Sequence, residues 1–96
     1  MFNYGLLEFK PQDIKIVDSI KEVFLKGEVF IININGTTLK TGDTLYIEKN
    51  NKFRKMKILE IKLNDKIVTE ISKGEIGIKG NIRVSKNSTV WIKNLP

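Results

Sequence analysis

The chain has 96 residues, enough for one domain with a modest core, and it contains neither cysteine nor histidine. This composition excludes a disulfide framework, a thiolate metal site and the Ser-His and Cys-His pairs of nucleophilic enzymes. The formal net charge is +6, with −2 in residues 1–48 and +8 in residues 49–96. An excess gathered in one half is typical of proteins that bind polyanions, although a lysine-rich surface can also serve solubility alone.

No segment predicts a membrane span or an exported protein. The N-terminus lacks the basic region and apolar core of a signal peptide, and the longest apolar run, Val29–Ile32, has four residues. We therefore expect a cytoplasmic protein with no membrane partner. Alanine is absent while Ile, Val and Thr are abundant, which favours strands over helices.

The first 27 residues fit more than one interpretation. Residues 1–12, which end near Pro11, predict an edge strand or an arm lying on the main domain. Residues 13–27 can be a helix with Asp13 as its N-cap and Gly27 just after its C-terminus. One face of that helix would carry Ile16, Ile20, Val23 and Phe24.

The same stretch can also be two strands. Alternation begins at Ile14, a turn falls near Asp18-Ser19, and a second strand runs from Ile20 into Val29 and beyond. We predict the strands, because the hairpin that follows needs partners. That hairpin is predicted at Asn35-Gly36, since both residues tolerate positive φ and follow the apolar strand that begins at Val29.

A second turn lies six residues farther along, at Gly42-Asp43, and it leaves no room for a helix between the two turns. Gly42 allows positive φ, so that the Asp43 side chain can cap the turn. The strand Thr44–Glu48 follows, with Leu45 and Ile47 on one face.

The second half of the chain alternates short strands and polar turns. The predicted turns are Lys49–Lys52, Asn64–Lys66, Ser72–Glu75 and Ser85–Ser88. The predicted strands and short pieces are 53–63 with a bend, 67–71, a strand from Ile76 that Gly77 bends or bulges, 82–84 and 89–92. In 53–63 the inward residues are Met56, Ile58, Ile61 and Leu63. Turn signals about every ten residues predict a single all-β domain, a small antiparallel β-barrel.

Taken in order, these turns resemble domain II of translational GTPases, the small β-barrel of elongation factor Tu and its relatives. The matching residues are Gly27-Glu28-Val29, Gly36, Leu39–Leu45, Lys73–Ile78 and Val84–Val90, so the resemblance covers about residues 14–92. The sequence departs from the family in a link from Gly36 to Gly42 that is one residue longer than usual, and in Asn87 where many members have glycine. The chemistry of Gly, Asn and Asp in turns makes Asn35, Gly36, Gly42, Asp43, Gly74 and Glu75 structural turn residues.

The resemblance implies RNA or the ribosome as a partner, because the corresponding domain of elongation factors contacts ribosomal RNA or the aminoacyl end of tRNA. It does not imply GTP binding, since the chain has no phosphate-binding Gly-x-x-x-x-Gly-Lys-Ser/Thr loop. Asn64-Asp65-Lys66 is interpreted as a turn and not as a guanine-reading motif. We expect no cofactor and no metal.

Two groups of basic residues, each without an acidic residue among them, are the candidate RNA-binding surface. The first is Lys49, Lys52, Arg54, Lys55 and Lys57 around Phe53, and the second is Lys79, Arg83, Lys86 and Lys93 around Trp91. Basic side chains on a hairpin can hold a phosphate backbone while an aromatic ring stacks on a nucleobase. The simpler interpretation is that the lysines form a solvated strand face and the two aromatic residues pack in or over the core.

These observations support two functional hypotheses. The first is a non-catalytic, stand-alone RNA- or ribosome-associated module. The alternative is a protein-interaction or accessory barrel that works with a separate enzyme and has no nucleic-acid role. A small enzyme is the least favoured class, because no histidine, cysteine or carboxylate pair suggests acid–base or nucleophilic chemistry.

Overall fold

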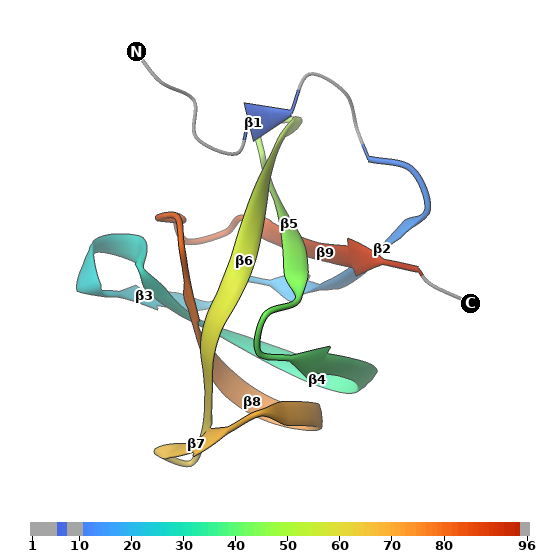
Figure 1. Cartoon of the computed structure of the whole chain (residues 1–96). Helices are drawn as coiled ribbons and strands as arrows, with labels where there is room; N and C mark the ends of the chain where they lie inside the picture. Colours follow the sequence, from blue (N-terminus) through green and yellow to red (C-terminus); the bar gives the residue numbers. More distant parts are fainter. Residues whose placement is uncertain (1–5, 8–10, 95–96) are drawn as a thin grey trace.

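The computed structural model describes residues 6–7 and 11–94, and these residues form antiparallel strands without an α-helix (Figure 1). The strands are β1 (Leu6–Leu7), β2 (Ile14–Ser19), β3 (Glu22–Phe24), β4 (Val29–Lys40), β5 (Thr44–Lys49), β6 (Lys52–Leu63), β7 (Lys66–Val68), β8 (Glu70–Gly80) and β9 (Thr89–Lys93), and η1 (Leu25–Gly27) is a single 3₁₀ turn. The predicted all-β class is confirmed, and so is the choice of strands over a helix in residues 13–27.

The strands form one strongly curled sheet, a small antiparallel β-barrel. Their order is β2-β9-β5-β6-β8-β4-β3, and β1 and β7 also pair with β6. The long strand β6 pairs with β5 along its first half and with β8 along its second, so it joins the two halves of the barrel. The curl brings β2 to β4, where the Asn33 backbone N–H donates to Asp18 Oδ2 at 2.8 Å.

The core forms because each long strand turns alternate apolar residues inward. The fully buried side chains are Ile20, Phe30, Ile32, Leu39, Leu45, Ile47, Met56, Ile58, Ile61, Ile76, Ile78 and Val90. Three of the four inward residues predicted for β6 are in this set, and Leu63 packs against it. The predicted bend in β6 is also present, because its register with β8 shifts between Ile58 and Glu60.

Most of the predicted polar turns are confirmed, and asparagine or aspartate supplies their positive φ. At Gly42-Asp43 the glycine has φ 96°, and Asp43 Oδ2 accepts the Lys40 backbone N–H at 3.0 Å, as predicted. The other positive-φ turn residues are Asn50, Asn51, Asn64, Asp65 and Asn87, with φ between 51° and 72°. Asn87 therefore takes the conformation that glycine would supply.

The predicted hairpin at Asn35-Gly36 is wrong. Strand β4 runs unbroken from Val29 to Lys40 and pairs with β8 on both sides of this point. Between the pairs Asn35↔Lys73 and Leu39↔Ile71 the register shifts, so the residues 36–38 bulge out of the ladder. Gly36, with φ 88°, provides the positive φ for the bulge instead of for a turn.

The predicted turn at Ser72–Glu75 is wrong for the same reason. Gly74 and Glu75 lie inside β8, opposite Ile34 and Asn33 of β4. Gly74 has φ 122°, so its conformational freedom is used within the strand beside the β4 bulge. Turn chemistry and bulge chemistry need the same residue types, and only the partner strand distinguishes them.

Three smaller expectations also need correction. The strand predicted from Ile20 into Val29 is broken by η1, where the chain reverses and β3 pairs with β4. Gly77 causes no register shift in either of its ladders. Residues 82–84 belong to a loop. Of the predicted N-terminal segment 1–12, Leu6–Leu7 form a strand on β6, and residues 1–5 and 8–10 lie outside the described residues.

The turn η1 is held by an unusually close backbone contact. Leu25, Lys26 and Gly27 all have positive φ, of 52°, 58° and 94°. The Gly27 carbonyl accepts the Val84 N–H at 2.9 Å, and a Cβ on Gly27 would overlap the Val84 carbonyl oxygen. Only glycine fits here, because both the conformation and the space exclude a side chain.

We predict that Gly27→Ala destabilises the fold far more than Gly42→Ala. Both glycines have φ near 95°, but a Cβ on Gly42 would meet no atom within 4 Å. Gly42→Ala should cost about 1–2 kcal/mol of unfolding free energy from strain alone, and Gly27→Ala about 2 kcal/mol more from the overlap. Urea denaturation of the two variants measures the difference, and equal losses would show that the close approach to Val84 does not constrain the fold.

Candidate functional site

The structure brings half of the predicted RNA-binding residues together at one end of the barrel. Two side chains of the β5–β6 hairpin reach the loop of residues 81–88. Lys49 Nζ donates to the Lys86 carbonyl at 2.8 Å, and Arg54 Nη2 donates to the Arg83 carbonyl at 2.6 Å. We call the resulting group of five cations the basic end: Lys49, Lys52, Arg54, Arg83 and Lys86.

The alternation of β6 decides which residues join the basic end. Lys52 lies opposite Lys49 in the hairpin, and Arg54 lies on the same side of β6 as Lys52. Lys55 and Lys57 are one position out of step, so they lie on the other side of the strand. The cluster that is continuous in sequence is therefore divided between two faces.

Two glutamates partly balance the basic end. Glu28 Oε2 lies 3.6 Å from Arg83 Nη2, and Glu22 Oε1 lies 3.6 Å from Lys86 Nζ. The five cations and two carboxylates leave a formal charge of +3. All four paired side chains are well exposed, and exposed pairs of this kind contribute little free energy. Either cation can therefore exchange its carboxylate for a phosphate at small cost.

Arg54 differs from the other members because its guanidinium is partly buried. Desolvation by this burial lowers the pKa of Arg54 from its ordinary value, but an arginine stays protonated at neutral pH. Its hydrogen bond to the Arg83 carbonyl compensates part of the desolvation. Arg54 thus holds the 81–88 loop in place beside the hairpin.

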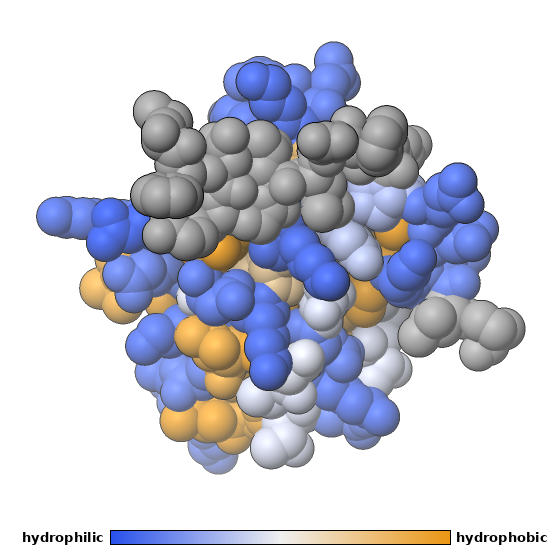
Figure 2. Space-filling model, turned by 45° about the horizontal axis from the view of Figure 1, so that its top comes forward, coloured by the Kyte–Doolittle hydropathy of each residue, from blue (hydrophilic) through white to orange (hydrophobic). Residues whose placement is uncertain are grey.

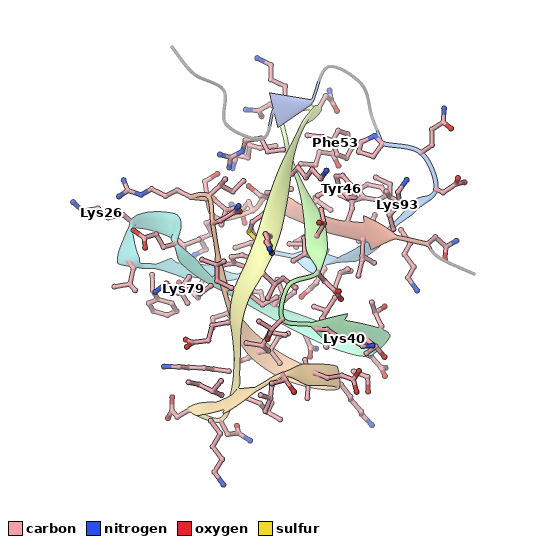
Figure 3. All side chains as sticks on the ribbon, in the orientation of Figure 1. Lys26, Lys40, Tyr46, Phe53, Lys79 and Lys93 are labelled. Atoms are coloured by element: carbon pink, nitrogen blue, oxygen red, sulfur yellow. The ribbon has the colours of Figure 1, made fainter. Side chains whose placement is uncertain are left out.

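The aromatic residues form a separate cluster on the outer side of β5, β6 and β9. Tyr46 and Phe53 lie near each other in Figure 3. Tyr46 lies opposite both Lys55 and Trp91, and the ring centroids of Phe53 and Trp91 are 6.0 Å apart. Trp91 Nε1 donates to Glu48 Oε1 at 2.8 Å. Phe53 is only 5 % exposed, so its ring offers no face for a nucleobase. Phe53 therefore packs against the barrel, as the simpler of the two interpretations of this residue predicted.

Lys79 and Lys93 lie far from each other, as their labels in Figure 3 show. Lys79 is on β8 between Val29 and Glu60 of the neighbouring strands. Lys93 ends β9, and its Nζ donates to the Gln12 carbonyl at 3.2 Å. Neither belongs to the basic end. The ten predicted residues therefore occupy several faces, and only the basic end combines both sequence groups.

Sequence reasoning missed a groove on the side of the barrel where Lys93 lies. It has a volume of about 790 Å³ and opens between β2 and β9 on one side and β4 on the other. Its lining is Lys15, Gly36, Thr37, Thr38, Lys40, Asp43, Thr44, Glu70, Ile92 and Lys93. No motif in the sequence marks it, because the groove results from the β4 bulge and from the way the sheet closes.

The described part of the chain shows neither a metal-binding cluster nor a membrane-spanning helix. Residues 6–7 and 11–94 contain no group of three or more acidic side chains arranged to hold a metal ion. Within the same residues no helix is long and apolar enough to cross a bilayer.

Comparison with known proteins leaves the resemblance to domain II as an expectation from sequence. The fold is that of a small all-β barrel, and two of the matching glycines, Gly36 and Gly74, lie in a bulge and in a strand where turns were expected. No protein-family model, no curated protein and no solved structure matches the chain.

Proposed function

We propose that this protein is a non-catalytic, cytoplasmic RNA-binding module of the translation-factor domain II type, which holds RNA or a ribosomal surface through its basic end. The observation that carries the proposal is the pair of hydrogen bonds from Lys49 and Arg54 to the 81–88 loop. They fix two basic segments side by side that are distant in sequence, since Lys49 and Lys86 are separated by 37 residues and Arg54 and Arg83 by 29.

The basic end suits a phosphate backbone because its cations lie on two adjacent loops. Lys52, Arg83 and Lys86 are exposed, and two of these three are engaged only in weak surface ion pairs. Such cations release counterions when they meet phosphates, which is the main source of affinity in sequence-independent binding. The net charge of +6 adds long-range attraction for any polyanion.

The buried Phe53 ring makes the proposed mode of binding electrostatic, without base stacking from that residue. We therefore expect modest affinity, weak sequence preference and strong salt dependence. The absence of histidine and cysteine from the sequence supports a binding function over a catalytic one.

We predict that replacing Lys52, Arg83 and Lys86 by glutamine abolishes most RNA binding. All three changes leave the two tethers intact, because the acceptors at Arg83 and Lys86 are backbone carbonyls. For wild type, the logarithm of the tRNA association constant should fall with the logarithm of salt concentration with a slope of about −4 for five phosphate contacts. The triple variant should reduce that slope by about 2–3. Fluorescence anisotropy with bulk tRNA measures both.

The matched control is Lys62→Gln, Lys66→Gln and Lys73→Gln. These exposed lysines lie on β6, β7 and β8 and remove the same charge from another part of the surface. A salt slope that falls equally in both triple variants would mean that net charge, and not the basic end, attracts RNA. If the wild-type protein does not bind tRNA at low salt, the proposal itself is overturned.

We further predict that Arg54→Gln weakens tRNA binding about fivefold more than Lys52→Gln, although each removes one charge. A fivefold difference corresponds to one lost tether of about 1 kcal/mol. Loss of the hydrogen bond to the Arg83 carbonyl should also speed amide exchange in residues 81–88, which Lys52→Gln should leave unchanged. Equal affinities for the two variants would show that Arg54 does not position the loop.

A further inference from the structure

The barrel has an open seam between β2 and β4, the two strands that face each other where the sheet closes. Among the described residues, β3 covers the outer edge of β4 only from Val29 to Ile31, and no strand pairs with the outer edge of β2. Beyond β3, the Asn33 N–H donates across the seam to Asp18 Oδ2 at 2.8 Å. Past this point the two edges enclose the 790 Å³ groove.

The edge of β2 offers backbone hydrogen-bonding groups in a regular strand. The Asn94 N–H donates to the Asp13 carbonyl, which fixes the phase of the ladder with β9. Because antiparallel ladders alternate, the backbone groups of Lys15 point to β9 and those of Ile14 and Ile16 point to the open edge. The pairing of β2 with β9 is regular from Ile14 to Ile16. By contrast, the facing edge of β4 is interrupted by the bulge at 36–38.

The side chains beside this edge alternate in character. Lys15 and its partner Ile92 line the groove, and Lys40 and Lys93 lie there with them. Ile16, on the opposite face of β2, is 58 % exposed, which is unusual for a large apolar residue. On the face drawn in Figure 2, the coloured surface is largely hydrophilic and the apolar residues form separate patches.

The charge of the groove favours an acidic ligand. Its lining contains three lysines and two carboxylates. Asp43 already accepts the Lys40 backbone N–H, and Glu70 is paired with Lys40 Nζ at 3.5 Å. Lys15, on the edge strand itself, forms no ion pair with any of the residues 11–94.

We propose that the seam binds an acidic peptide segment of another protein, which adds as an extended strand antiparallel to β2. Its inward side chains would be carboxylates facing Lys15, and its outward side chains would be apolar and pack on Ile16. Backbone hydrogen bonds to Ile14 and Ile16 would supply affinity, and the alternation would supply specificity. This site lies apart from the basic end and does not depend on RNA binding.

Lysine and bulges on an exposed edge also protect proteins against unwanted strand pairing. That role would reject every added strand, whereas the proposed site accepts one whose charges match. The two roles therefore give opposite results with an acidic strand-forming peptide.

The test uses the full chain and a capped peptide of alternating glutamate and valine, about nine residues long. A control peptide replaces each valine by proline, which keeps the negative charge and removes backbone N–H donors. Binding is followed by the fluorescence of Trp91, which lies opposite Ile16 on β9, and by amide exchange. We expect the alternating peptide to slow exchange of the Ile16 amide about tenfold at saturation and the proline peptide to have no such effect.

Three variants locate the site. Lys15→Glu should weaken binding of the alternating peptide about tenfold, because it places like charges on neighbouring strands. Ile16→Pro should abolish it, since it removes an outward N–H at an edge where proline is tolerated. Lys62→Glu, which makes the same charge change on β6, should have no effect. Lys15→Glu keeps the proposal testable if Ile16→Pro does not fold.

Several results would overturn the inference. These are no binding of the alternating peptide, equal effects of the two peptides, or perturbations confined to residues 49–54 and 81–88. Failure of the tRNA experiments would leave this result unaffected, and the glutamine variant of the basic end should bind the alternating peptide as wild type does.

Discussion

The backbone contact between Gly27 and Val84 is the constraint on which the geometry of the basic end depends. It joins the reversal between β3 and β4 to the long loop that leads into β9. Next to it, the Gly80 N–H at the end of β8 donates to the Glu28 carbonyl at 3.1 Å. With the loop fixed at this point, the Arg83 and Lys86 carbonyls are in place to accept hydrogen bonds from Arg54 and Lys49.

This arrangement explains why cations gather without strong repulsion. Two of the basic side chains donate hydrogen bonds to backbone carbonyls, and two others form ion pairs with glutamates from the β3–β4 region. The hydrogen bonds to the carbonyls lie within the protein and need not break when an anion binds. The ion pairs are exposed, and an anion can replace the glutamates. The free protein therefore already holds its cations in the geometry that a polyanion would meet.

The sequence predicts the class of fold well because alternation and Asn, Asp or Gly turns are local signals. Met56, Ile58 and Ile61 of β6 are buried as their spacing indicates, and Asp43 caps its turn. The errors at Gly36 and Gly74 share one cause, which is that positive φ serves turns and bulges alike and only a distant strand decides between them. The candidate site is likewise only partly predictable from sequence. Strand alternation places Arg54 and Lys55 on opposite faces, but no local pattern indicates that Arg83 lies next to Arg54.

The bulge at residues 36–38 also changes which positions along the chain face the core. Before it, β4 buries the even-numbered Phe30, Ile32 and Ile34, and after it the odd-numbered Leu39. Strand β8 changes phase at the same level, from Ile71 to Ile76 and Ile78. Because residues 36–38 are left out of the β4–β8 ladder, a change of length there need not alter the pairing on either side of the bulge. Related sequences could in this way reshape the wall of the groove while the barrel stays the same.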